Sequence, residues 1–206
     1  EQHNVMRALK NSFATTILQT LIALAVSSIA GYGFEIYHDK AKDTVMAILM
    51  LAMMVPFVAV LVPLFQMFTK AKLINTWAAF ILPSIATPFL IMYFRNSARS
   101  FPRDTLEAAR IDGLNEFQIF IRMFIPMMKP TYASAATITF MNAWNAYLWP
   151  KVVMQTNEAI TMPMLVANTM GGYVIDYGVV MAAVTICSLP TAIIFFCLQK
   201  SFTNAV

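Results

Sequence analysis

The chain has 206 residues, of which 59% are hydrophobic and 12% are charged. Several apolar runs exceed the roughly 20 residues that span the hydrocarbon core of a bilayer. This composition excludes a soluble domain. The net charge of +4 does not indicate a nucleic-acid partner, because the basic residues are scattered between the apolar runs. The sequence therefore predicts an all-α membrane protein with one transmembrane domain over 1–206, whose surroundings are the lipid bilayer.

Five membrane spans are predicted, at 11–34, 44–68, 76–96, 126–149 and 177–199. In the first span, Ala23, Ser27 and Gly31 follow one another at a spacing of four residues, as in the small-residue ridges that let a second helix approach closely. Gln19 is the strongly polar side chain inside this span. The second and third spans are interrupted by prolines, at Pro56 and Pro63 and at Pro83 and Pro88.

The distribution of Lys and Arg orients the spans. If the polar segment 102–124 is cytoplasmic, nine of these residues lie in inner segments and five in outer segments, a distribution that the positive-inside rule favours. Trp77 and Trp149 are then predicted at the outer membrane interface, where indole rings are enriched. The connection 151–176 is then extracytoplasmic, either long enough to touch an external partner or an ordinary connector.

The segment 102–124 is predicted to form two short helices joined at Gly113. Asn115, with Gln118 three residues later, has the pattern of an N-cap with its capping-box partner. The spacing of Phe117, Phe120, Ile121 and Phe124 predicts one apolar face on the second helix. By spacing alone, this pair either docks on a partner protein or rests on the lipid headgroups, with Phe117 and Phe124 in the lipid.

The predicted spans contain no Asp, Glu, Lys, Arg or His in their interiors, and the sequence contains no GxxxxGK[ST] phosphate loop. Ion-coupled carriers normally need charged groups near the midplane. Energy is therefore expected to come from outside this chain, and the chain is not predicted to be an enzyme. No metal site is expected either, because His3 and His38 lie in separate polar segments without ligand spacing.

Asn142, Asn145 and Tyr147 are candidates for lining a translocation path through the fourth predicted span. Hydroxyl-rich solutes need side-chain donors and acceptors beside aromatic faces, which this short cluster provides. The same residues equally fit hydrogen bonds between helices or anchoring at the membrane interface.

The polar segment resembles the EAA loop of permease subunits in ATP-driven (ABC) importers. Glu107-Ala108-Ala109, Gly113 and Pro126 match that pattern at its full spacing, while Met123 and Ile125 replace its isoleucine and leucine. Asp112 and the run from Trp144 to Pro150 are similar to the sugar-importing branch, particularly to the subunit that partners the larger permease in maltose-type systems.

The resemblance implies a type I importer helical bundle that forms half of the path for a sugar or oligosaccharide. It implies that the loop docks on an ATPase, through Glu107, Ala108, Ala109, Asp112, Gly113 and Phe117. The implied partners are a second related permease, two ATP-binding subunits that hold ATP and magnesium, and an extracytoplasmic solute-binding protein.

The resemblance further implies the inner membrane of a bacterium or archaeon, with this loop in the cytoplasm. Because the family usually has six spans, the first span of the family is expected to be missing from this sequence. The alternatives are an importer permease for another class of solute and an ion-driven secondary carrier.

Overall fold

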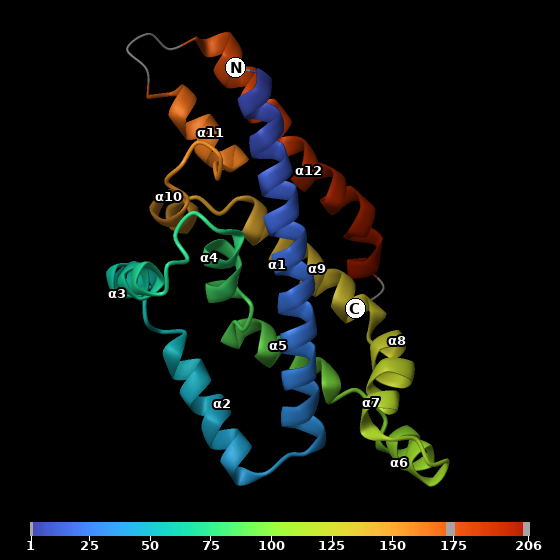
Figure 1. Ribbon diagram of the computed structural model, residues 1–206. Coiled ribbons are helices and arrows are strands. Elements are labelled where there is room, and N and C mark those ends of the chain that lie inside the picture. Colours follow the sequence, from blue (N-terminus) through green and yellow to red (C-terminus); the bar gives the residue numbers. More distant parts are fainter. Residues whose placement is uncertain (1, 172–175, 204–206) are drawn as a thin grey trace.

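The computed structural model describes residues 2–171 and 176–203, with side chains described for 5–171 and 176–197. Within these ranges all regular structure is helical (Figure 1). The elements in chain order are α1 (Gln2–Ile36), α2 (Lys40–Ala52), α3 (Phe57–Lys70), α4 (Trp77–Ile81), the 3-10 helix η1 (Leu82–Ser84), α5 (Pro88–Ala98), α6 (Arg103–Ile111), α7 (Glu116–Ile119), the π-helix η2 (Phe120–Phe124), α8 (Ile125–Met127), α9 (Lys129–Trp144), α10 (Leu148–Val153), α11 (Met162–Thr169) and α12 (Tyr177–Thr203).

Helix α1 runs almost the whole length of the molecule, and α5, α9 and α11 pack along it (Figure 1). Its small-residue ridge is the contact surface, because Ala23 and Ser27 are fully buried. At Gly31 the crossing with α5 is so close that a methyl group would lie 2.6 Å from Cβ of Phe94. The close approach predicted for this ridge is confirmed.

Among the described residues, two helices are each long and apolar enough to cross a membrane, at Val5–Ile36 and Tyr177–Cys197. The run 44–68 instead forms α2 and α3, which meet at an angle of 100°. Pro56 lies at this bend, where it lacks an N–H and disfavours a helical conformation in the residue before it. The run 76–96 forms α4 with η1 and then α5, bent by 49°. Prolines therefore divide both predicted spans into shorter helices.

The run 126–149 also differs from one continuous span. Helix α9 has 16 residues and so a length of about 24 Å, and the chain turns after Trp144 into the short α10. This turn carries Trp149 back against α4, where its indole N–H donates to the Ala79 carbonyl at 2.7 Å. Trp149 is only 7% exposed, so its ring packs inside the bundle and not against lipid headgroups, while its depth at the outer interface stays a prediction.

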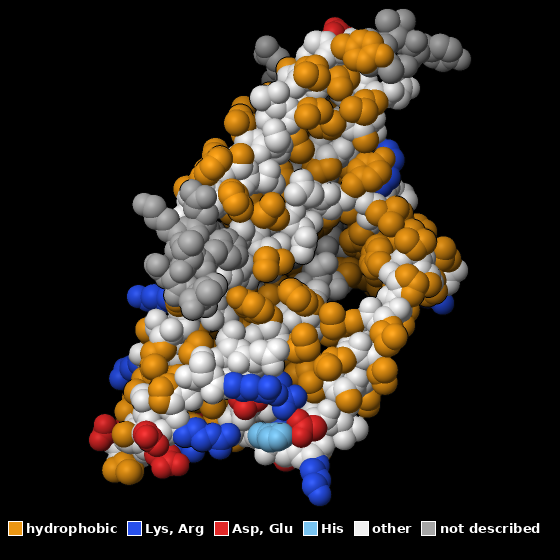
Figure 2. Space-filling view, turned by 180° about the vertical axis from the view of Figure 1, so that it is seen from behind, with side chains coloured by type: hydrophobic (Ala, Val, Ile, Leu, Met, Phe, Trp, Pro, Cys, Tyr) orange, Lys and Arg blue, Asp and Glu red, His pale blue; other side chains and the backbone are white. Residues whose placement is uncertain are grey.

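At the end of α1 opposite its N-terminus, charged side chains gather on the surface (Figure 2). The centre of this group is Arg95 on α5, which is 7% exposed. Its Nε lies 3.3 Å from Oε2 of Glu35 on α1, and its Nη2 lies 2.6 Å from Oδ1 of Asp43 on α2. One buried guanidinium therefore holds three helices together.

The other end of α1 is attached to the connection that follows α10. The Asn11 amide donates to the carbonyls of Glu158 and Ile160 at 2.8 and 3.0 Å. The Ser12 hydroxyl accepts a hydrogen bond from the backbone N–H of Met162 at 2.8 Å. The part of this predicted connection at 172–175 lies outside the described residues.

Candidate functional site

The turn after α6 is set by Gly113, whose φ is +81°. The backbone N–H of Leu114 donates to the Ala109 carbonyl at 3.0 Å, and that of Gly113 donates to the Arg110 carbonyl at 3.1 Å. These two bonds form a Schellman motif, which needs a left-handed residue at the position of Gly113. The predicted glycine turn is confirmed, and Asp112 is the C-cap residue before it.

The second helix of the pair begins as the sequence predicts. Asn115 Oδ1 accepts from the Gln118 backbone N–H at 2.9 Å, and Gln118 Oε1 accepts from the Asn115 backbone N–H at 3.0 Å. The capping box is therefore confirmed. Four residues later the helix widens into the π-helix η2.

The prediction of one apolar face on this helix is wrong in part. Phe120 and Phe124 are buried, whereas Phe117 is 69% exposed and Ile121 is 44% exposed. Phe124 packs against Tyr32 on α1, with ring centroids 4.9 Å apart. Phe124 is therefore a core residue and does not lie in the lipid.

The helix pair is joined to α1 by polar contacts as well. The Tyr32 hydroxyl donates to Oε2 of Glu116 at 3.3 Å, and the Arg110 Nε donates to Oε1 of Glu116 at 2.8 Å. Burial raises the pKa of the Glu116 carboxyl, but the hydrogen bonds it accepts, first of all from Arg110, lower this pKa by a larger amount. The pKa of Glu116 therefore lies below its ordinary value. The stabilisation from this contact is therefore present at neutral pH and is lost as the pH falls through that lowered value.

The remaining side chains predicted for docking divide into two groups. Glu107 and Ala108 are exposed, together with Ile111, which is 86% exposed. Ala109 is 2% exposed and packs in the cluster with Leu106 and Phe124. Its small side chain is therefore used inside this chain and is not available to a partner, contrary to the role predicted for it.

Replacing Gly113 by alanine should destabilise the turn by about 1–2 kcal/mol, the cost of a left-handed conformation for a residue with a Cβ. Nothing lies within 4 Å of the added methyl group, so the whole effect is backbone strain. Gly113→Asn is the matched control and should cost less, because asparagine visits this conformation more readily. Thermal unfolding of the purified protein in detergent measures both. Equal losses for the two variants would contradict this assignment of strain.

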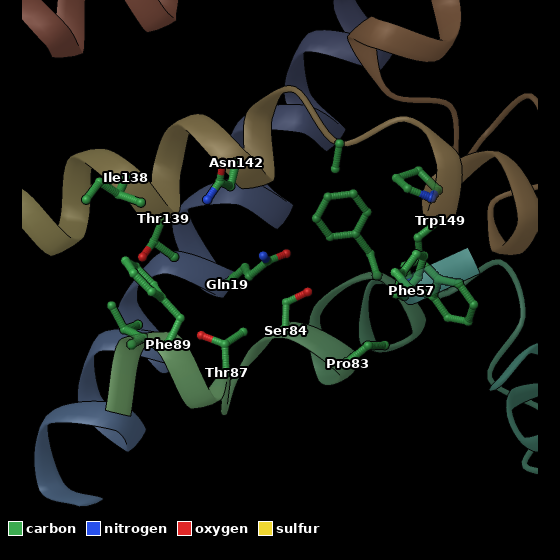
Figure 3. A pocket seen from close by; sticks show the side chains of 14 residues that line it. Gln19, Phe57, Pro83, Ser84, Thr87, Phe89, Ile138, Thr139, Asn142 and Trp149 are labelled. Atoms are coloured by element: carbon green, nitrogen blue, oxygen red, sulfur yellow. The ribbon is translucent and has the colours of Figure 1, made fainter. Parts of the chain in front are cut away.

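A cavity of about 300 Å³ lies beside the middle of α1. Gln19, Ser84, Thr87 and Asn142 project into it from α1, η1, the start of α5 and α9 (Figure 3). The side chains that close its other sides are largely aromatic or apolar and include Phe57, Phe80, Phe89 and Trp149.

The structure separates the three residues predicted for a translocation path. Asn142 lines the cavity, whereas Asn145 and Tyr147 do not. The Asn145 amide instead donates to the Met141 carbonyl of its own helix at 2.8 Å. Sequence reasoning did not find Ser84 and Thr87, because nothing in their neighbourhood indicates that the chain break between η1 and α5 faces Gln19.

An all-helical membrane domain that presents a glycine-jointed helix pair beyond its long helices has the architecture of an importer permease. The chain belongs to the family of binding-protein-dependent transport system inner membrane components, whose model matches residues 23–206.

Two named relatives support this assignment. The lactose transport system permease protein LacG of Rhizobium radiobacter is 41% identical over 95% of this chain and 72% of its own length. The arabinooligosaccharides transport system permease protein AraQ of Halalkalibacterium halodurans is 34% identical over 93% of this chain and 69% of its own length.

The fold agrees with solved transporters of this class. A bacterial ABC transporter that imports the acidic polysaccharide alginate matches with a TM-score of 0.87 and 22% identity, over 97% of this chain and 75% of that one. The MetNI methionine ABC transporter matches with a TM-score of 0.73 and 20% identity, over 100% of this chain and 97% of that one. The chain is thus a membrane-embedded ABC importer permease, and the ATPase activity of such importers resides in a separate subunit. The alternative of an ion-driven carrier is set aside.

Proposed function

We propose that this chain forms half of the transmembrane path of an ATP-driven importer for a sugar or oligosaccharide. A second related permease supplies the other half, and an extracytoplasmic solute-binding protein delivers the ligand. Two ATPase subunits with ATP and magnesium supply the energy. The sugar class is supported by the lactose and arabinooligosaccharide permeases, which are both at least 34% identical to this chain.

The observation that carries the proposal is the surface formed by Glu107, Ala108, Ile111 and Phe117. Two large apolar side chains here are 86% and 69% exposed, on a segment that is fixed to α1 by Tyr32 and Glu116. An exposed apolar tip on a firmly held base suits transmission of force from a partner into the spans. The tip lies on the charged end of the molecule (Figures 1 and 2), which supports a cytoplasmic location by the positive-inside rule.

Reversing the charge of Glu107 should weaken capture of the ATPase. Affinity purification of the full-length Glu107→Lys protein from mild detergent should recover about tenfold less P-loop ATPase than the unchanged protein, as expected when one charged contact of an interface becomes repulsive. Recovery of the partner permease should not change, because Glu107 is exposed on the surface of this chain.

Glu158→Lys is the matched control, since it makes the same change at an exposed residue on the opposite end of the molecule. It should leave ATPase recovery unaltered. Equal recovery with both variants would contradict the docking surface, and a chain that purifies without any ATPase would contradict the importer itself.

A further inference from the structure

The cavity beside α1 contains a buried amide with unused hydrogen-bonding capacity. Gln19 is 6% exposed, and its Oε1 accepts no hydrogen bond from any described residue of the chain. Buried polar side chains in proteins nearly always have partners. This oxygen is also closed to solvent, so a ligand in the cavity that Gln19 lines can donate to it only when the side-chain amide turns over.

Gln19 lies near the middle of a helix that is long and apolar enough to cross a membrane. Gln19 is the middle residue of α1 (Gln2–Ile36), about 25 Å from either end at 1.5 Å per residue. Opposite it the chain leaves η1 after Ser84 and starts α5 after Thr87. Irregular backbone at membrane depth is tolerated where it is buried in protein or lines a polar cavity.

Hydroxyl groups at this break are available to a ligand. The Thr87 side chain makes no capping hydrogen bond to α5, although it occupies the N-cap position. Ser84, Thr87 and Gln19 face one another, and the Asn142 amide approaches the same space from α9 (Figure 3). Hydroxyls and amides together offer both donors and acceptors, which matches the alternating requirements of a sugar ring.

The cavity also lacks any group that could neutralise an acidic ligand. None of the 14 residues that line it, all within the described part of the chain, is ionisable. The start of α5 does little to stabilise a negative charge in the cavity, because Pro88 at its first position has no N–H to donate. A carboxylate placed here would lose its hydration without gaining a cation.

From these observations we infer that the cavity formed by Gln19, Ser84, Thr87, Asn142 and Trp149 is a binding subsite for a neutral saccharide. The apolar faces of the sugar ring pack against Phe57 and Phe89, which are each 42% exposed, and the ring hydroxyls bond to Gln19, Thr87 and Asn142. Acidic saccharides are excluded. This inference rests on the proposed import of sugars, and it adds that this subunit itself contacts the sugar and selects it by charge.

Equilibrium binding to the purified transporter tests the subsite directly. The probes are radiolabelled lactose, raffinose and digalacturonate. They are added to the full-length protein with its co-purifying subunits in mild detergent, without soluble binding protein or ATP. At least one neutral probe should bind. The Kd of digalacturonate should be about tenfold higher or more, which corresponds to a loss of about 1.4 kcal/mol in binding free energy.

Two variants in the cavity and one outside it separate a subsite from a packing role. Gln19→Leu and Asn142→Ala should each raise the Kd of the neutral probe about tenfold, corresponding to one lost hydrogen bond. Asn142 is exposed, so its replacement tests the subsite without burdening the fold. Asn145→Ala is the matched control, because this amide bonds within its own helix, and it should leave the Kd unchanged.

The possible failures are distinguishable. Digalacturonate binding as tight as that of the neutral probes would overturn the charge selection. Equal Kd values for all three variants, or a complex that takes up sugar with ATP but binds none of the probes, would overturn the subsite alone. A complex without ATPase and without ATP-driven uptake would overturn the proposed function and the subsite together.

Discussion

Gly31→Ala should destabilise the protein by about 2–3 kcal/mol, although it adds only one methyl group. The added carbon would lie 2.6 Å from Cβ of Phe94 and 2.7 Å from the backbone nitrogen of Arg95. Neither atom is the end of a flexible side chain, so α1 and α5 must move apart to accommodate it. Overpacking of a well-filled contact typically costs about 1–3 kcal/mol, and backbone atoms on the far side place this case at the upper end.

Gly33 provides the matched control for this substitution. It lies one residue beyond Tyr32 on the same helix, and nothing lies within 4 Å of a methyl group added there. Gly33→Ala should therefore be neutral or stabilising by up to about 1 kcal/mol, because alanine is the better helix former. The loss of monodisperse protein after heating in detergent, followed by size-exclusion chromatography, ranks the two variants. Similar midpoints for Gly31→Ala and Gly33→Ala would contradict the close crossing of α1 and α5.

The elements that the sequence predicts well are those determined by residues close together in the chain. The ridge of Ala23, Ser27 and Gly31, the turn at Gly113 and the capping box at Asn115 each depend on fewer than ten neighbouring positions. Their physical causes are helical periodicity, a positive φ and a local side-chain hydrogen bond. Such patterns are visible without knowledge of the rest of the fold.

The features that sequence reasoning missed depend on segments that are far apart. Trp149 is buried because α10 returns to α4, and its hydrogen-bond partner Ala79 is 70 positions away. Gln19 was recognised as a polar residue in an apolar helix, but its meeting with Ser84 and Thr87 requires the bend that divides the third predicted span. The prolines predict that a break occurs, and the packing of the whole bundle decides its angle and what it faces.

The sequence also does not predict that Arg95 is buried in ion pairs. Arg95 lies at the edge of an apolar run, where it has the pattern of an ordinary cation that flanks a membrane span. In the fold it is 7% exposed and contacts Glu35 and Asp43, which are 60 and 52 positions away. Arg95→Leu should cost about 3 kcal/mol, the lower end of the range for a broken buried ion pair, because Glu35 stays largely buried but keeps its contact with the exposed Arg99. The Glu35 side chain is only 16% exposed, so water cannot fully replace the guanidinium.

Arg99→Leu tests whether burial, and not charge alone, causes this loss. The Arg99 side chain is 60% exposed and also lies near Glu35, with Nε 3.4 Å from Oε2. Its removal should cost at most about 1 kcal/mol, as for other exposed pairs. Glu35→Gln combined with Arg95→Leu should restore part of the stability lost in Arg95→Leu, because the buried negative charge is then absent. The comparison uses the thermal midpoints in detergent of the unchanged protein, Arg95→Leu, Arg99→Leu and the double variant. A double variant no more stable than Arg95→Leu would show that Arg95 acts through its contact with Asp43 instead. In that case α2, and not α1, would be the helix that the buried cation holds.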